Sequence, residues 1–340
     1  MSDFNDALQH IVNRRAALTA DQAFSAMREV MAGQVAPELL AAFLVALRMK
    51  GETVDEIVGF ARAMRGAAVR ITPARRPLVD TCGTGGDAIK TFNVSTAAAF
   101  VVAGAGVAVA KHGNRSVTSK CGSADVWEAL GLSLERTPDQ VKADIELVGI
   151  GFLFAPAFHP AMKYAAPVRK ALGMRTVFNV LGPLTNPAGA TAQVVGVFSD
   201  ALIQPLGAAL AALGAERALV VHGEGGLDEL STMGQSLVGD VRNGQVNLQR
   251  ITHDQFGLPR AKEADLAAGT PAENAARLES VLRGEKGPAR DIVVLNAAAG
   301  LVAGGVAEDL AAGVAQAIEV IDSGAAQRVL VRLRTAHSRG

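Results

Sequence analysis

The chain has 340 residues, of which 49% are hydrophobic, and its 33 Lys and Arg residues balance its 33 Asp and Glu residues. This composition predicts a globular protein with a large core and excludes a global basic surface for nucleic acid or for an anionic membrane. The longest uncharged apolar run, residues 97–110, is too short and too glycine-rich to span a bilayer. The N-terminus does not resemble a signal peptide, and Cys82 and Cys121 make no disulfide framework, so we expect a cytoplasmic protein.

Residues 1–75 predict a small helical domain. Two capping boxes, Thr19–Gln22 and Thr53–Glu56, precede segments with helical apolar periodicity. Pro37 marks another helix start, and Gly51 marks the end of that helix. No strand-like run occurs in this part of the sequence.

From Leu78 onward, short β-prone runs alternate with segments of helical length. This alternation predicts an α/β fold with a mostly parallel central sheet that is covered by helices on both faces. In such sheets, ligands bind at the carboxyl ends of the strands. The expected strands are residues 78–81, 107–110, 151–154, 193–198, 218–221 and 292–295.

A proline-rich segment, residues 162–190, interrupts this alternation. It has a helical pattern followed by a loop-like one, with Pro167 and Pro187 among its helix breakers. We therefore expect this segment to return to the helical domain. Residues 76–161 and 191–340 would then form the large α/β catalytic domain.

The region from residue 88 to residue 124 contains no Asp or Glu, although it carries Lys90, Lys111, Arg115 and Lys120. The glycine-rich motif DTCGTGGD precedes it, the motif KHGNRSVTSKCGSAD ends it, and each motif follows an expected strand. Glycine-rich turns offer backbone N–H groups, hydroxyl side chains offer further donors, and the lysines offer counter-charge. This combination predicts a pocket for a ligand with several phosphates.

Two other phosphate-binding signatures do not fit. Gly83, Gly85 and Ala88 satisfy a dinucleotide-binding G-x-G-x-x-A pattern, but Lys111 stands where that fold requires an acidic residue. The sequence has no G-x-x-x-x-G-K-[ST] motif, which excludes a P-loop. A purely structural turn stays open as the alternative for the glycines alone.

Asn93, Ser95 and Thr96 belong to the segment 91–96, where we expect the next helix to begin. Each of these residues is an ordinary helix cap when taken singly. Three polar residues within four positions exceed the need of one cap. Together with the free N–H groups of a first helical turn, they predict an anion site.

Asp228 and Glu229 come shortly after the strand expected over residues 218–221. A solvated helix start, where negative charge is favourable, stays open as one interpretation of this pair. In a pocket for pyrophosphate, however, two carboxylates would repel the ligand unless a cation lay between them. Because Mg²⁺ binds carboxylates and phosphates together, the pair predicts a magnesium site.

Arg169 lies where we expect a helix to start, a position at which the helix dipole disfavours a cation. A guanidinium there is suited to bind a carboxylate in a bidentate manner, and a plain surface charge is the alternative. Among the six histidines, His112 is the best candidate because it adjoins Lys111, and His159 is the second. No spacing of Cys and His indicates zinc.

Five ordered blocks together resemble the anthranilate phosphoribosyltransferase family. They are DTCGTGGD, KTFNVST, KHGNRSVTSKCGSADVWEALG, FAPAFHPAMKYAAPVRKALGMRTVFNVLGPLTNP and VVHGEGGLDELS, and the resemblance runs across nearly the whole chain. It implies a fold like that of nucleoside phosphorylases and phosphoribosyltransferases, and a homodimer formed through the helical domain. It also implies transfer of the phosphoribosyl group of phosphoribosyl pyrophosphate (PRPP) to the amine of anthranilate, with release of pyrophosphate, in tryptophan biosynthesis.

The resemblance also assigns residues to the two substrates and to Mg²⁺. The residues implied to contact PRPP are Gly83, Gly86, Asp87, Thr91, Asn93, Val94, Ser95, Thr96, Lys111, Ser119 and Ser123. The residues implied to contact anthranilate are Gly83, His112, Asn114 and Arg169, and those implied to bind Mg²⁺ are Ser95, Asp228 and Glu229. The sequence departs from the family pattern at Ala88, Thr118, Cys121 and Trp127, which leaves the backbone near Ala88 open.

The implied reaction requires no strong protein base, because an aromatic amine is already unprotonated at neutral pH. We therefore assign no nucleophile and no obligatory base. Two alternatives stay open. One is a pyrimidine nucleoside phosphorylase, against which the blocks KHGN and GLDELS argue. The other is a nucleic-acid-binding relative, against which the zero net charge and the single Trp and Tyr argue.

Overall fold

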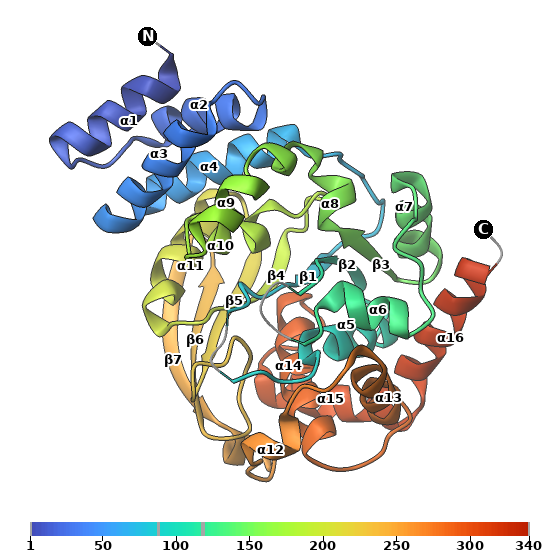
Figure 1. Cartoon of the computed structure of the whole chain (residues 1–340). Helices are drawn as coiled ribbons and strands as arrows, with labels where there is room; N and C mark the ends of the chain where they lie inside the picture. The colour runs from blue at the N-terminus through green and yellow to red at the C-terminus, as the bar shows by residue number, and fades with distance from the viewer. Residues whose placement is uncertain (1, 87–88, 117–119, 339–340) are drawn as a thin grey trace.

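The computed structural model describes residues 2–86, 89–116 and 120–338 (Figure 1). Its N-terminal part is helical, as predicted, and the capping boxes at Thr19 and Thr53 are both formed. Gly51 ends the third helix with a φ of 86°, a backbone conformation that residues with a side chain rarely adopt. The four helices are α1 (Asp3–Arg14), α2 (Ala20–Met31), α3 (Pro37–Lys50) and α4 (Val54–Ala67).

The described residues form one seven-stranded sheet with the order β3-β2-β1-β4-β5-β6-β7. Its first five strands in this order are parallel, whereas β6 and β7 pair antiparallel, so the predicted mostly parallel α/β fold is confirmed. The order reverses direction between β1 and β4, and ligands bind at such a reversal. The strands are β1 (Leu78–Thr81), β2 (Ala108–Gly113), β3 (Ile150–Phe154), β4 (Ala192–Gly196), β5 (Arg217–Gly223), β6 (Gln235–Arg242) and β7 (Gln245–Thr252).

One expected strand is wrong, and one pair of strands was not predicted. Residues 292–295, expected as a strand, lie in the helix α14 (Pro288–Ala303), which is buried on almost every side. A short apolar run does not distinguish a buried helix from a buried strand. The hairpin of β6 and β7 was not predicted, although its turn, Asn243-Gly244, has positive φ at both residues, as tight hairpin turns require.

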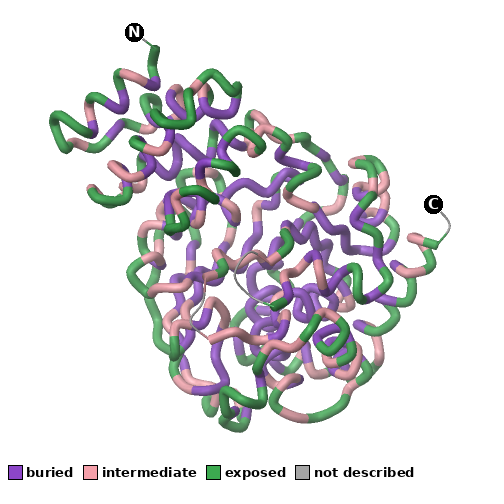
Figure 2. The backbone as a smooth tube through the Cα atoms, in the orientation of Figure 1, coloured by how far each residue is buried: buried purple, intermediate pink, exposed green. Residues whose placement is uncertain are grey.

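Helices cover both faces of the sheet. Val194 and Leu219 point into a core formed with α5, α13, α14, α15 and α16, whereas Val195 and Val220 point into a core shared by α11 and the helices α1–α4. Figure 1 shows these two sets of helices on opposite sides of the sheet, and Figure 2 shows the buried backbone between them. These helices are α5 (Val94–Gly104), α11 (Ile203–Ala212), α13 (Pro271–Leu282), α15 (Leu310–Asp322) and α16 (Ala325–Ser338).

The proline-rich segment forms short helices that pack on the N-terminal bundle. α9 (Ala166–Leu172) contacts α3, and α10 (Phe178–Leu181) contacts α4. The side chains of Val168 and Phe178 belong to the same apolar cluster as the bundle. The boundaries that we assigned to the two domains stay a prediction.

The remaining helices connect these layers. They are α6 (Ser123–Ala129), α7 (Pro138–Leu147), α8 (Ala155–Phe158) and α12 (Glu263–Leu266), with 3-10 turns at Pro160–Tyr164, Gly182–Thr185, Asp200–Leu202 and His253–Phe256. Within the described part of the chain, none of the helices has the length and apolar character that crossing a membrane requires.

Candidate active site

The glycine-rich loop after β1 lies at the reversal of strand order, where it is fixed from two sides. Gly85 and Gly86 have φ of 64° and 77°, conformations that side chains disfavour. The N–H of Thr84 donates to the carbonyl of Gly196 at the end of β4, at 2.8 Å. The N–H of Gly85 donates to Asp228 Oδ2 at 2.9 Å. The loop therefore joins the ends of β1 and β4 to the acidic segment.

The helix α5 begins at Val94, within the segment 91–96 where its start was expected, and Thr91 forms an isolated bridge to Ala267. Asn93 stands at the cap position, but its side chain makes no cap hydrogen bond. Its Nδ2 donates to the carbonyl of Cys121 at 3.3 Å, and its Oδ1 accepts from Asn274 Nδ2 at 3.0 Å. Capping therefore does not explain Asn93. Its side chain links the start of α5 to the motif KHGNRSVTSKCGSAD through Cys121.

The first turn of α5 faces the acidic pair. The N–H of Ser95 donates to Glu229 Oε1 at 3.1 Å. Val94 and Thr96 are buried, and the Thr96 hydroxyl has no hydrogen-bond partner among the described residues. The structure thus brings Ser95 and Glu229 together, as a shared cation site requires.

Lys111, near the end of β2, is a buried and fixed cation that is only 1% exposed. Its Nζ donates to the carbonyl of Thr81 at 2.5 Å and lies 3.4 Å from Ser95 Oγ. Burial lowers the pKa of Lys111, and the nearby carboxylates Asp80 and Glu229 act in the opposite direction. Its position between β1 and α5 is suited to a phosphate or pyrophosphate group.

Asp228 and Glu229 lie in an irregular segment after β5, so the alternative of a solvated helix start is wrong. The segment is closely packed, because a Cβ on Gly83 would lie 2.5 Å from Asp228 Oδ2. Burial and the neighbouring Asp228 raise the pKa of Glu229 to about 8. Two carboxylates and the Ser95 hydroxyl are the oxygen donors that Mg²⁺ prefers, so the residues present fit this ion.

A third carboxylate, Asp80, is fully buried beside the site and supports β2. Its Oδ1 accepts from the N–H of His112 at 3.1 Å, and its Oδ2 accepts from Asn186 Nδ2 at 2.7 Å. Burial raises the pKa of Asp80 to about 6. Asp80, Cys82 and His112 have ligand atoms within 4.8 Å of one another. A thiol and an imidazole suit Mg²⁺ poorly, and both oxygens of Asp80 already accept amide hydrogen bonds.

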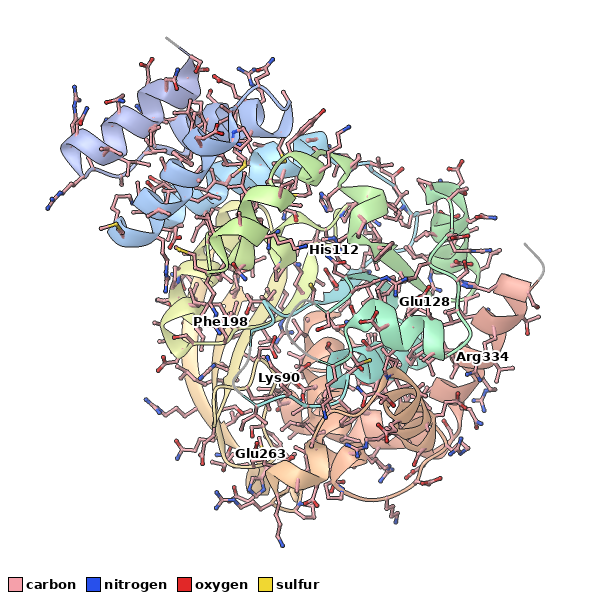
Figure 3. All side chains as sticks on the ribbon, in the orientation of Figure 1. Lys90, His112, Glu128, Phe198, Glu263 and Arg334 are labelled. Atoms are coloured by element: carbon pink, nitrogen blue, oxygen red, sulfur yellow. The ribbon has the colours of Figure 1, made fainter. Side chains whose placement is uncertain are left out.

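His112 and His159 form a buried pair whose ring centroids are 5.0 Å apart. Figure 3 shows His112 beside the proline-rich segment, where its Nδ1 lies 3.2 Å from the carbonyl of Gly182. Among the described residues, neither Nε2 atom has a hydrogen-bond partner. Burial lowers the pKa of His112 to about 3 and that of His159 to about 4, so both rings are neutral at pH 7. The Nε2 of His112 is therefore a free acceptor, because its Nδ1 donates to Gly182.

The remaining predicted residues occupy different surroundings. The N–H of Asn114 donates to Ser123 Oγ at 3.2 Å, which joins the end of β2 to α6. Arg169 lies in the last turn of α9, so the argument from a helix start is wrong. Its guanidinium lies 5.2 Å from the ring centroid of Phe178. Asp87 and Ser119 lie outside the described residues.

Three side chains near the site were not predicted. Arg175 donates to the carbonyl of Gly86 and lies 3.9 Å above the ring of Phe198. Asn274 holds Asn93, and Asn296 contacts the residue that follows Glu229. Each lies far from the glycine-rich loop in the sequence and has no local motif, so only tertiary contacts reveal it.

Comparisons with known proteins agree with this site. The α/β domain of a glycosyl transferase family matches residues 75–327, and the helical bundle domain of that family matches residues 5–68. Anthranilate phosphoribosyltransferase of Symbiobacterium thermophilum is 55% identical over 317 residues, which cover 93% of each chain. The crystal structure of the Thermus thermophilus enzyme is 49% identical, with a TM-score of 0.93 over 99% of this chain and 100% of that one.

Structures of the Saccharomyces cerevisiae enzyme are more distant but carry ligands. The complex with PRPP and Mg is 29% identical, with a TM-score of 0.90 over 99% of this chain and 98% of that one. The complex with 4-fluoroanthranilate is 27% identical, with a TM-score of 0.89 over the same shares. By the shared fold and by more than half of its residues in common with a curated relative, the chain belongs to the anthranilate phosphoribosyltransferase family.

Proposed function

We propose that this protein is an anthranilate phosphoribosyltransferase that acts in tryptophan biosynthesis. It transfers the phosphoribosyl group of PRPP to the amine of anthranilate, which gives N-(5-phosphoribosyl)anthranilate and pyrophosphate. The observation that carries the proposal is the meeting of a buried lysine, the first turn of α5 and a carboxylate pair at the reversal between β1 and β4. Cations and carboxylates side by side suit a pyrophosphate with its metal ion.

PRPP is expected to occupy the loop after β1 and the start of α5. Gly83 lets the loop backbone approach the carboxylate of Asp228, Gly86 lies against the guanidinium of Arg175, and Lys111 supplies a fixed positive charge. The other residues assigned to this substrate are Asp87, Thr91, Asn93, Val94, Ser95, Thr96, Ser119 and Ser123.

Mg²⁺ would be held by Ser95, Asp228 and Glu229. When bound, it supplies the positive charge that lets pyrophosphate lie next to two carboxylates and leave as an anion. The contact of 3.1 Å between the N–H of Ser95 and Glu229 Oε1 supports this assignment, because it places Ser95 beside the carboxylate pair.

Anthranilate would lie on the side of the proline-rich segment. Arg169 would bind the carboxylate of anthranilate, and the neutral His112 would accept a hydrogen bond from its amine. Asn114 and Gly83 would complete the contacts. This arrangement holds the amine near C1 of the ribose.

Catalysis would then depend on charge and position and not on a protein base. Departure of pyrophosphate leaves a ribose centre with oxocarbenium character, as in glycoside hydrolysis. Lys111 stabilises the charge that collects on the leaving group, while the protein holds the neutral amine in line for attack. The proton lost by the amine after attack needs no strong base.

We also propose that the protein acts as a cytoplasmic homodimer through its helical domain. Exposed apolar side chains on α1 and α3 support this surface, since Val12 is 52% exposed, Leu39 40% and Met49 84%. Met49→Glu should shift the sedimentation velocity of the protein toward that of a monomer. An unchanged dimer would place the interface elsewhere.

The decisive assay mixes the protein with Mg²⁺, PRPP and anthranilate, and follows the loss of anthranilate fluorescence and the release of pyrophosphate. We expect equal amounts of both changes, near-complete loss in a chelator and partial recovery with Mn²⁺. No turnover by folded protein with intact substrates would refute the activity. Phosphorolysis of a pyrimidine nucleoside in a parallel assay would favour the phosphorylase alternative.

The carboxylate pair is tested with Asp228→Asn combined with Glu229→Gln. The double variant should require more Mg²⁺ and show a lower kcat. Glu224→Gln is the matched control, because Glu224 belongs to the same loop but is exposed and pairs with Arg260. Superimposable Mg²⁺ titrations of the double variant and the wild type would show that the pair does not bind the metal.

A further inference from the structure

Asn296 is a buried amide in the middle of α14, and only 2% of it is exposed. Its Oδ1 accepts from the N–H of Leu230 at 2.8 Å, and its Nδ2 donates to the carbonyl of Leu230 at 2.9 Å. The same Nδ2 also donates to the carbonyl of Ile292 at 2.9 Å. One side chain thus pairs both backbone polar groups of the residue that follows Glu229.

Leu230 depends on this contact because its own surroundings are apolar. Leu230 is 0% exposed, and without Asn296 its N–H and its carbonyl would be buried and unpaired. The other end of the segment is held by the bridge between Gly223 and Leu227. Asp228 and Glu229 therefore lie between two fixed points.

The place of Asn296 is also close to the proposed metal ligands. Asn296 lines a small internal void together with Thr81, Ser95 and Glu229. The neighbouring residues of α14 are almost all apolar, and the packing of this helix alone would accept a leucine, which has no polar group that needs a partner. The amide is therefore explained by Leu230 and not by the packing of α14.

We propose that Asn296 is a positioning residue for the magnesium site. It holds the backbone of Leu230, and through it the carboxylates of Asp228 and Glu229, against Ser95 and the glycine-rich loop. This inference rests on the proposed function of the carboxylate pair. Residues that orient the ligands of a metal without touching it commonly change metal affinity by about 10- to 100-fold when they are replaced.

The test replaces Asn296→Leu, which removes the three hydrogen bonds at a similar volume. Calorimetry measures PRPP binding in the absence of anthranilate at several Mg²⁺ concentrations, so that the readout does not depend on turnover. We expect the Mg²⁺ concentration for half-maximal PRPP binding to rise about 10-fold or more. High Mg²⁺ should restore PRPP affinity, and the KM for anthranilate should stay unchanged at saturating Mg²⁺ and PRPP. Amide hydrogen exchange should become faster at Leu230.

Leu301→Ala is the matched control, because Leu301 is a buried apolar residue five positions further along the same helix. It should lower the melting temperature without changing the Mg²⁺ requirement. An Asn296→Leu protein that loses thermal stability but keeps the native Mg²⁺ requirement would overturn the proposal and leave Asn296 a structural residue.

Two further variants separate a failure of the role proposed for Asn296 from a failure of the proposed magnesium site. If Asn296→Leu does not fold, Asn296→Gln keeps an amide one methylene further from α14 and should raise the Mg²⁺ requirement, and an unchanged requirement would again overturn the proposal. The double variant Asp228→Asn with Glu229→Gln separates the two levels of inference. If the double variant shifts the requirement and the Asn296 variants do not, only the role of Asn296 fails. If none of them shifts it, the metal role of the carboxylate pair fails as well.

Discussion

Replacement of Gly196 by alanine should disable the site through a backbone contact. Gly196 ends β4, and a Cβ at this position would lie 1.6 Å from the carbonyl oxygen of Asp228 and 2.5 Å from its carbonyl carbon. Real Cβ atoms essentially never come closer than 3.0 Å to another heavy atom, so the carbonyl of Asp228 must retreat by about 1.4 Å. The segment resists this movement, because Gly85 and Asn296 hold it from either side.

A displacement of this size has a large expected effect on catalysis. Misplacement by about 1 Å commonly costs about 100-fold in rate, so kcat/KM for PRPP should fall at least about 100-fold, equivalent to roughly 3 kcal/mol. Gly83→Ala should have a smaller effect. Its Cβ would lie 2.5 Å from the carboxylate of Asp228, whose side chain can rotate, and 3.5 Å from the backbone carbonyl oxygen of Asp228, which is an ordinary contact.

The assay is the initial rate of anthranilate consumption at varied PRPP and Mg²⁺, with circular dichroism as the check on folding. Gly151→Ala in β3 is the matched control, because its Cβ would lie 2.7 Å from Ile145 Cγ1 and 2.8 Å from the carbonyl of Val141. Overpacking there should cost about 1–3 kcal/mol of stability while each folded molecule keeps its activity. A folded Gly196→Ala protein with kcat/KM within about threefold of wild type would refute the reasoning.

Three other replacements test separate parts of the site. Arg169→Ala should lower kcat/KM for anthranilate by about 30- to 150-fold, because a charge-assisted bidentate contact contributes roughly 2–3 kcal/mol, and should leave the KM for PRPP nearly unchanged; an unchanged kcat/KM for anthranilate would make Arg169 a surface charge. Asn274→Leu should raise the KM for PRPP about tenfold without changing that for anthranilate, because it removes the bond that orients Asn93, worth about 1.4 kcal/mol; equal changes for both substrates in steady-state kinetics would point to general unfolding. Because burial raises the pKa of Asp80 from 3.8 to about 6, its carboxyl contributes stability that is present below pH 3.8 and lost as the pH rises through 6. The stability of Asp80→Asn relative to wild type should therefore improve by roughly 2–2.5 kcal/mol between pH 4 and pH 7 in urea titrations, and a constant difference would contradict the shift.

Much of the fold is readable from the sequence because its signals are local. The capping boxes at Thr19 and Thr53 and the strand at residues 78–81 depend on neighbouring residues, and the structure has them as predicted. The strand expected at residues 292–295 failed because the apolar run belongs to a helix buried on almost every side. A short apolar run indicates that its residues are buried, but it does not show whether they form a helix or a strand.

The site residues also fall into those that a local sequence signal marks and those that only tertiary contacts reveal. Lys111 and the acidic pair are recognisable because charge and spacing mark them, and the family resemblance assigns them to PRPP and Mg²⁺. Asn274 and Asn296 carry no such mark, since each contacts a segment more than 60 residues away. Arg169 is a residue that the sequence marked for a wrong reason. It lies in the last turn of α9, so the helix-dipole argument that first singled it out does not apply.

The apolar cluster that joins α1–α4 to the sheet restricts how this enzyme can be shortened. Val195 and Val220 of the sheet, and Leu206 and Leu210 of α11, belong to the same cluster as the N-terminal helices. A shortened enzyme that begins near residue 75 would lose α4, which packs on α11, and would expose the apolar side chains of α11 that α4 covers, at roughly 1.5–3 kcal/mol for each one fully uncovered. Efforts to obtain a minimal catalyst, or to split the chain for complementation, therefore need replacements on the outer surface of α11 before any helix is removed.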